Sequence, residues 1–192
     1  MNIVQIGTNR AYDDVTALVR DYGVDTLILV EPLVMHHSII EECYKDIENK
    51  HIESLAITDD VNLKELTFYY HKEDSPGFEV AGLSKQHILK HAVFNPKLTE
   101  DGIVELVIPC TTLNDLLAKY NLSTVNVLYI DVEGMDDKLI YSLDLDRFNI
   151  INIIYEHLHI DAEKVIQYLD SKGYDTARNY GHNGWSHAAV KR

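Results

Sequence analysis

Two carboxylates at the end of an apolar run are the strongest candidates for chemistry in this sequence. Asp131 and Glu133 directly follow residues 125–130, which read Val-Asn-Val-Leu-Tyr-Ile. Aliphatic, β-branched and aromatic residues in such a run favour a strand that is covered on both faces. In an open parallel sheet, ligands bind beyond the carboxyl ends of the strands, and we expect Asp131 and Glu133 to face that crevice. A carboxylate here can also cap the following helix, so both roles remain open for Asp131.

A second polar group follows the next apolar run. Residues 150–155 read Ile-Ile-Asn-Ile-Ile-Tyr, and Glu156, His157 and His159 come after them. If the two strands are neighbours, Glu156 lies near the first pair of carboxylates. An imidazole has an unperturbed pKa of about 6.5 and exchanges a proton near neutral pH, which makes His157 a candidate general base. The alternative is a structural histidine that caps the next helix.

The first two predicted strands also end in residues that suit a ligand. The apolar run at residues 2–6 breaks at Gly7, and Glu31 follows the run at residues 26–30, 24 positions beyond Gly7. In doubly wound folds a glycine lets the first loop approach a nucleotide-like cofactor, and an acidic residue about 20 positions later binds the ribose hydroxyls. Either residue alone is more often a simple turn or strand end. Together they indicate a cofactor site.

The composition of the first loop selects among cofactors. Dinucleotide binding asks for Gly-x-Gly-x-x-Gly, whereas residues 7–12 read Gly-Thr-Asn-Arg-Ala-Tyr. NAD is therefore disfavoured. A nucleoside cofactor without phosphates, which carries a cationic sulfonium amino acid at its other end, needs fewer glycines and tolerates a surplus of carboxylates. S-adenosylmethionine fits that description.

The remaining elements follow from hydrophobic periodicity and turn residues. A third strand is expected over residues 51–57, ending near Asp59. Asp59 can bind the amino group of an adenine or form an Asx turn, and both interpretations remain open. The other predicted elements are helices at 12–21, 35–49, 85–91, 112–120, 135–142 and 161–172, strands at 65–70 and 104–108, and a closing hairpin of 174–179 and 185–190.

His87 and His91 stand four residues apart on one of these predicted helices. Such a pair can bind a metal, but the residues between them supply neither a glutamate nor a third ligand. We therefore predict no metal at this pair, and interpret it as an exposed face or as a lid on the substrate side. Trp185, in the closing hairpin, is open to two interpretations, edge packing or a substrate platform.

Composition limits the class of protein. The 192 residues, 46% hydrophobic and 25% charged, suit a single globular domain over residues 1–192. A formal net charge of -14 repels nucleic acids and anionic membrane surfaces. Two cysteines make no disulfide framework, and no run of about 18 apolar residues occurs. We expect a cytoplasmic monomer or homodimer that binds neither nucleic acid nor membrane.

Several segments, taken in order, resemble the FkbM family of S-adenosylmethionine-dependent methyltransferases. The most specific are Thr111-Thr-Leu-Asn-Asp115 and Tyr129-Ile-Asp-Val-Glu-Gly-Met-Asp136. The resemblance runs from about Val4 to Tyr174. Its other segments are Val4-Gln-Ile-Gly-Thr-Asn9, Val30-Glu-Pro32, Leu55-Ala-Ile-Thr-Asp59 and Ile154-Tyr-Glu-His157.

The resemblance implies an α/β fold, the three-layer Rossmann-like class I methyltransferase sheet, mostly parallel and seven-stranded with an antiparallel edge strand. It also implies O-methylation of a hydroxyl on a small molecule or carbohydrate. We then expect three groups of site residues. Asp131 and His157 are the catalytic candidates, Glu133, Glu156 and His159 the substrate-binding ones, and Gln5, Gly7, Thr8, Asn9, Glu31, Pro32, Ile57 and Asp59 the cofactor-binding ones.

The first loop departs from the family pattern, which has an acidic residue before Gly-x-Asn-x-Gly. Gln5 stands in place of the acid and Ala11 in place of the second glycine. Gln5 can still accept a hydrogen bond from the ammonium group of the cofactor, and Arg10 can meet its carboxylate. One alternative is a non-catalytic nucleoside-binding domain with a degenerate loop. Another is a divalent ion held by Asp131, Glu133 and Glu156.

Overall fold

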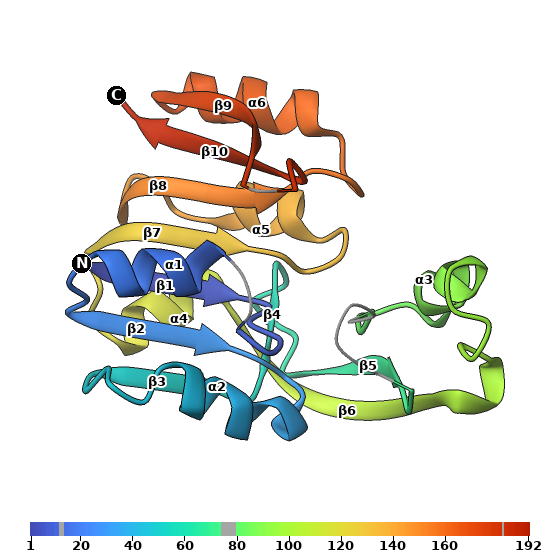
Figure 1. Ribbon diagram of the computed structural model, residues 1–192. Helices are drawn as coiled ribbons and strands as arrows, with labels where there is room; N and C mark the ends of the chain where they lie inside the picture. The colour runs from blue at the N-terminus through green and yellow to red at the C-terminus, as the bar shows by residue number, and fades with distance from the viewer. Residues whose placement is uncertain (12–13, 74–79, 182) are drawn as a thin grey trace.

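The computed structural model describes residues 1–11, 14–73, 80–181 and 183–192. A seven-stranded sheet with the order β3-β2-β1-β7-β8-β10-β9 forms its centre (Figure 1). Strands β3, β2, β1, β7 and β8 run parallel, and β10 pairs antiparallel with both β8 and β9. Its strands are β1 Asn2–Ile6, β2 Thr26–Val30, β3 Lys50–Glu53, β7 Thr124–Ile130, β8 Asn149–Glu156, β9 Tyr174–Tyr180 and β10 Ser186–Lys191.

Helices cover both faces of the sheet because alternate residues of each strand point to opposite sides. In β1, Ile3 packs with α1 and α2, whereas Val4 and Ile6 pack with α4, α5 and α6. Both faces of the inner strands are therefore apolar, as expected for buried parallel strands. The helices are α1 Asp14–Asp21, α2 His37–Cys43, α3 Lys85–Lys90, α4 Leu113–Lys119, α5 Asp136–Ser142 and α6 Ala162–Ser171.

A second, three-stranded sheet has the order β4-β6-β5. It consists of β4 Ala56–Thr58, β5 Glu65–His71 and β6 Ile103–Thr112. Strands β5 and β6 pair antiparallel, and β4 runs parallel to β6. With α3, they project beyond the carboxyl ends of the main strands (Figure 1). This segment therefore stands where a ligand would enter.

The expected third strand at residues 51–57 is wrong as a single element. Its first half is β3 in the main sheet, and its second half is β4 in the small sheet. Ser54 and Leu55 lie between the two strands, so the chain changes sheets there. Hydrophobicity indicates that a segment is extended but carries no information about which strand it pairs with.

Other element boundaries differ from the predictions in smaller ways. The helix expected at 35–49 is shorter, a 3₁₀ turn at Val34–His36 followed by α2. Asp161, not a histidine, caps α6, because its side chain accepts a hydrogen bond from the Lys164 amide. Residues 12 and 13 of the first predicted helix lie outside the described residues. Among those described, no helix is both long and apolar enough to cross a membrane.

Candidate active site

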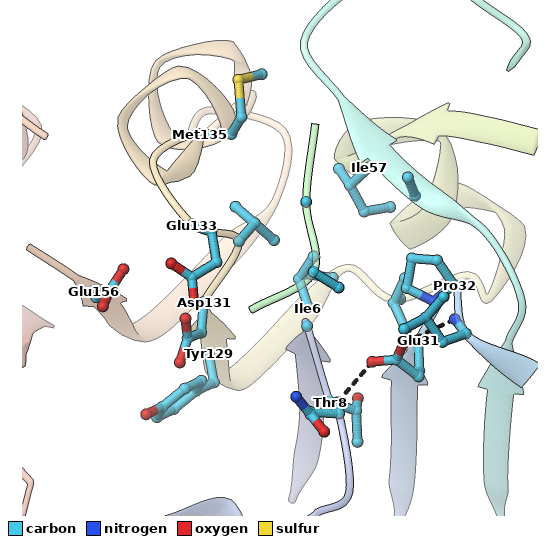
Figure 2. A pocket seen from close by; sticks show the side chains of 18 of the residues that line it. Ile6, Thr8, Glu31, Pro32, Ile57, Tyr129, Asp131, Glu133, Met135 and Glu156 are labelled. Carbon is cyan, nitrogen blue, oxygen red and sulfur yellow. Dashed lines mark hydrogen bonds between the residues drawn. The ribbon is translucent and has the colours of Figure 1, made fainter. Parts of the chain in front are cut away.

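A cavity of about 370 Å³ lies at the carboxyl ends of the central strands. Its walls come from the segments after β1, β2, β7 and β8, from β4, and from β5 and the residues that follow it. Figure 2 shows Asp131, Glu133 and Glu156 on one side of the cavity and Glu31 on the other. The sheet order produces this arrangement, because β1 separates β2 from β7 and β8. The crevice is therefore where parallel-sheet topology places it.

The loop after β1 packs directly against the end of β7. Gly7 has a φ of +81°, and its amide donates a hydrogen bond to the Val30 carbonyl at 3.0 Å. A Cβ atom at this position would collide with the main-chain carbonyl oxygen of Asp131. Glycine alone meets both requirements, the left-handed backbone and the close approach. The loop after β1 and the end of β7, where Asp131 lies, are therefore in direct contact.

Glu31 is built into the wall of the cavity. Its side chain is buried, and its two carboxylate oxygens accept hydrogen bonds from the amides of Asn9 and Leu33, at 2.7 and 2.8 Å. Nδ1 of the buried His36 lies 3.7 Å from one of these oxygens. Each carboxylate oxygen has a second lone pair, which remains available to a ligand hydroxyl.

Two polar atoms of the first loop are buried beside Glu31. Thr8 Oγ1 and Asn9 Oδ1 have no hydrogen-bond partner among the described residues, and both residues line the cavity. Asn9 has a φ of +50°, in the left-handed region of backbone conformation. Buried polar atoms in proteins are nearly always paired. These two therefore point to a polar ligand.

A fourth carboxyl group, Asp136 at the start of α5, contacts the acidic side of the cavity but is not among its described lining residues. Asp136 is fully buried, and burial together with the charge of Asp131 raises its pKa well above the usual value. Its Oδ1 accepts a hydrogen bond from the Glu156 amide at 3.3 Å. Burial, assisted by the charges of Glu133 and Asp136, raises the pKa of Glu156 to about 8. Near neutral pH, Glu156 is therefore largely protonated.

We expect the replacement Glu156→Gln to flatten the dependence of stability on pH. The unfolded chain releases the Glu156 proton near pH 4.5, whereas the native protein keeps it to about pH 8. Between these values the native state binds more protons, so wild-type stability falls as the pH rises. The slope attributable to one proton is at most about 1.4 kcal/mol per pH unit. Urea unfolding of both proteins from pH 5 to 8 measures the difference, and parallel curves would contradict the assignment.

His157, the residue after β8, makes its contacts at the closing hairpin and not in the cavity, which corrects its assignment as a general base. Its ring stacks on His187, with centroids 4.1 Å apart, and its Nε2 lies 3.1 Å from the Gly184 carbonyl oxygen. It is absent from the described residues that line the cavity. His157 packs under the closing hairpin instead.

Two of the expected cofactor contacts also lie elsewhere. Gln5 is completely buried in β1, and Asp59 is exposed just after β4. Neither is among the described lining residues, although Ile57, two positions before Asp59, is. The alternation of β1 explains Gln5, because its side chain points to the same face as Ile3. The lining does include the other expected cofactor contacts, Gly7, Thr8, Asn9, Glu31, Pro32 and Ile57.

The expected substrate residues meet at one edge of the cavity. Glu133 and Glu156 line it, and His159 Nε2 lies 3.6 Å from a carboxylate oxygen of Glu133. His87 Nε2, from α3, lies 3.0 Å from the same oxygen. The contact between His87 and Glu133 therefore joins α3, which lies between β5 and β6 in the chain, to the end of β7.

One lining residue that sequence reasoning missed is Phe68 from β5, because nothing in an alternating strand marks an aromatic residue as a cavity wall. Trp185, for which edge packing and a substrate platform were both open, lines the cavity from the segment before β10, with its side chain about half exposed. Asp136 is not a lining residue, but its burial was also missed. It closes the most specific motif of the sequence, whereas an acidic residue at a helix start is normally an exposed partner of the helix dipole.

Comparison with known proteins identifies the fold. A family model described as the methyltransferase FkbM domain matches residues 5–176. The O-methyltransferase from Bacillus cereus in complex with SAH has a TM-score of 0.51 at 12% identity, over 99% of this chain and 74% of that one. The ribosomal protein L11 methylase from Lactobacillus delbrueckii subsp. bulgaricus has a TM-score of 0.46 at 12% identity, over 100% and 69%. No curated protein matches the chain. The expected mostly parallel sheet with an antiparallel edge is confirmed.

Proposed function

This chain belongs to the FkbM methyltransferase family, and we propose that it transfers the methyl group of S-adenosylmethionine to a hydroxyl group of a small molecule or sugar. Dependence on S-adenosylmethionine follows from the family; the hydroxyl acceptor is the proposal. One observation carries it. Carboxylates from the ends of β7 and β8 line the same cavity as the loop after β1 and Glu31. A cofactor region and a proton-accepting region are thereby joined.

The side of the cavity formed by β1 and β2 fits S-adenosylmethionine. Glu31 would accept hydrogen bonds from the ribose hydroxyls, and the unpaired oxygens of Thr8 and Asn9 would bind the polar end of the cofactor. Arg10, which lines the cavity and is 9% exposed, would hold the methionine carboxylate. Ile57 adds apolar surface for an adenine ring.

When bound, the cofactor supplies a methyl group that is activated by its attachment to a sulfonium. The protein must align the acceptor oxygen, exclude water and take up the hydroxyl proton. We assign proton acceptance to Asp131, because its backbone touches the cofactor loop at Gly7. Glu156, largely protonated near neutral pH, would instead donate a hydrogen bond to a second oxygen of the acceptor.

The acceptor is a small or carbohydrate hydroxyl compound under this proposal. The acidic side of the cavity offers several hydrogen-bonding carboxyl groups, which suit a polyhydroxylated molecule. The formal net charge of -14 disfavours a nucleic acid or a membrane surface as partner. We propose that the protein acts on such acceptors as a monomer or homodimer.

The replacement Glu31→Gln is expected to weaken S-adenosylmethionine binding at least about tenfold. Hydrogen bonds to a charged group contribute roughly 1.5 to 3 kcal/mol each, and about 1.4 kcal/mol corresponds to tenfold in affinity. Glutamine also presents an amide N–H to the Asn9 or Leu33 amide, both of which now donate to the carboxylate. Isothermal titration calorimetry with the cofactor measures the change.

The control for this variant is Glu42→Gln on α2, an exposed glutamate that pairs with Lys45. It makes the same chemical change away from the cavity and should bind the cofactor like the wild type. Thermal unfolding without ligand should show both variants folded. If Glu31→Gln binds S-adenosylmethionine as tightly as the wild type does, Glu31 is not part of the cofactor site.

A further inference from the structure

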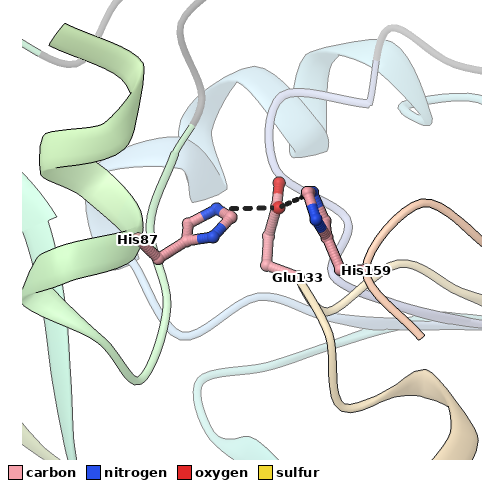
Figure 3. A group of neighbouring side chains, drawn as sticks. All are labelled: His87, Glu133 and His159. Atoms are coloured by element: carbon pink, nitrogen blue, oxygen red, sulfur yellow. Dashed lines mark ion pairs between the residues drawn. The ribbon is translucent and has the colours of Figure 1, made fainter.

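Three side chains that are distant in the chain converge at the edge of the cavity (Figure 3). His87 comes from α3, Glu133 follows β7, and His159 follows β8. The Nε2 atoms of His87 and His159 lie 3.0 and 3.6 Å from the same oxygen, Oε2 of Glu133. All three atoms lie within 4.8 Å of one another. Two imidazoles and one carboxylate therefore point at a common position.

The backbone around Glu133 is shaped to allow this convergence. Glu133 has a φ of +55°, in the left-handed region that glutamate rarely adopts, and Gly134 follows with +94°. A Cβ at Gly134 would lie 3.3 Å from the Cβ of His159, closer than ordinary packing permits. Strained residues of this kind persist where the surrounding structure imposes them, commonly at functional sites.

Hydrogen bonding among the three side chains does not account for the arrangement. Nε2 of His87 is buried and makes no hydrogen bond, although it lies 3.0 Å from the Glu133 oxygen. A neutral imidazole that presents the lone pair of Nε2 to the carboxylate would be repelled by it. A cation placed between them gives both atoms a partner.

We propose that His87, Glu133 and His159 bind one divalent metal ion of the zinc type. Two imidazole nitrogens and one carboxylate oxygen suit such borderline metals, whereas magnesium and calcium take oxygen ligands. Tetrahedral coordination with bonds of about 2.0 to 2.2 Å places ligand atoms roughly 3.3 to 3.6 Å apart. The two contacts with Glu133 are 3.0 and 3.6 Å and all three atoms lie within 4.8 Å, so side-chain rotation must bring the set to that spacing.

The proposal corrects the prediction that His87 and His91 lack the ligands for a metal. The glutamate and the second histidine come from the ends of β7 and β8 rather than from the same helix. Three protein ligands leave at least one position open, as catalytic zinc sites do, and Glu133 also lines the cavity. The ion would fasten α3 and its segment to the strand ends. Metal binding does not depend on the proposed methyl transfer. An experiment can therefore refute either proposal and leave the other standing.

The test is a zinc titration of chelator-treated, full-length protein against a chromophoric competitor. We expect the wild type to bind one equivalent of zinc, and His87→Ala, His159→Ala and the isosteric Glu133→Gln to weaken binding at least tenfold each. His91→Ala is the matched control, because the rings of His91 and His87 lie 4.9 Å apart on neighbouring turns. It should bind zinc like the wild type. Circular dichroism of each variant verifies that it is folded.

Cobalt(II) in place of zinc reports the ligands by its visible spectrum, which should change in the same three variants. Failure of the wild type to bind one equivalent would overturn the proposal. Zinc binding that survives all three substitutions, or that His91→Ala weakens as strongly as they do, would overturn it as well, since the ten histidines of the chain offer other places for adventitious zinc.

Discussion

Asp131→Asn is expected to lower kcat by about 10²- to 10⁴-fold while the protein stays folded. Asparagine keeps the size and capping ability of aspartate but cannot accept the hydroxyl proton. The N-cap residue of α5 is Met135, not Asp131, so a loss of helix capping would not explain lower turnover. The measurement is methyl transfer to an acceptor found by screening sugars and polyhydroxylated metabolites, with cofactor binding and thermal unfolding recorded for the same variant.

Two companion variants separate the possible bases. His157→Ala should retain near-wild-type turnover, because His157 stacks on His187 and is absent from the described residues that line the cavity. Glu156→Gln tests the rival carboxyl group, which also lines the cavity. Full activity of Asp131→Asn together with an inactive Glu156→Gln would transfer the role of base to Glu156. An inactive but folded His157→Ala would contradict the geometry described for the site.

Gly7→Ala is expected to destabilise the protein by roughly 2 to 5 kcal/mol, from backbone strain together with steric overlap. The new methyl group would meet the Asp131 carbonyl oxygen, and alanine is disfavoured at a φ of +81°. For a domain of this size, at about 2 to 4 °C per kcal/mol, the unfolding midpoint should fall by roughly 4 to 20 °C. Cofactor affinity should fall too, because the loop after β1 must move away from the end of β7. Thermal unfolding and calorimetry measure the two effects.

Gly23→Ala is the matched control for this prediction. Nothing lies within 4 Å of an added Cβ at Gly23, and its φ is not positive. Alanine there should leave the unfolding midpoint near that of the wild type, or raise it slightly by restricting the unfolded chain. Equal midpoints for the Gly7 and Gly23 variants would show that the contact with Asp131 is not tight.

The sequence by itself determined four strands of the main sheet. Strands β1, β2, β7 and β8 were each predicted within one residue, because residues covered on both faces must be continuously apolar. It also determined that Glu31, Asp131 and Glu156 stand at strand ends. Once the strands are parallel, their carboxyl ends lie at one edge of the sheet, so these residues share a region whatever the details of packing.

Only the tertiary structure decided which side chains enter the cavity. Glu156 and His157 are adjacent in sequence and equally suited to chemistry, but Glu156 lines the cavity whereas His157 stacks on His187 in β10. The division of residues 51–57 between two sheets left Ile57 in the cavity wall and Asp59 outside it. The meeting of His87 with Glu133 and His159 depends on how the segment from β5 to β6 sits over the sheet. Such contacts join residues far apart in the chain, and local hydrophobic patterns hold no information about long-range pairing.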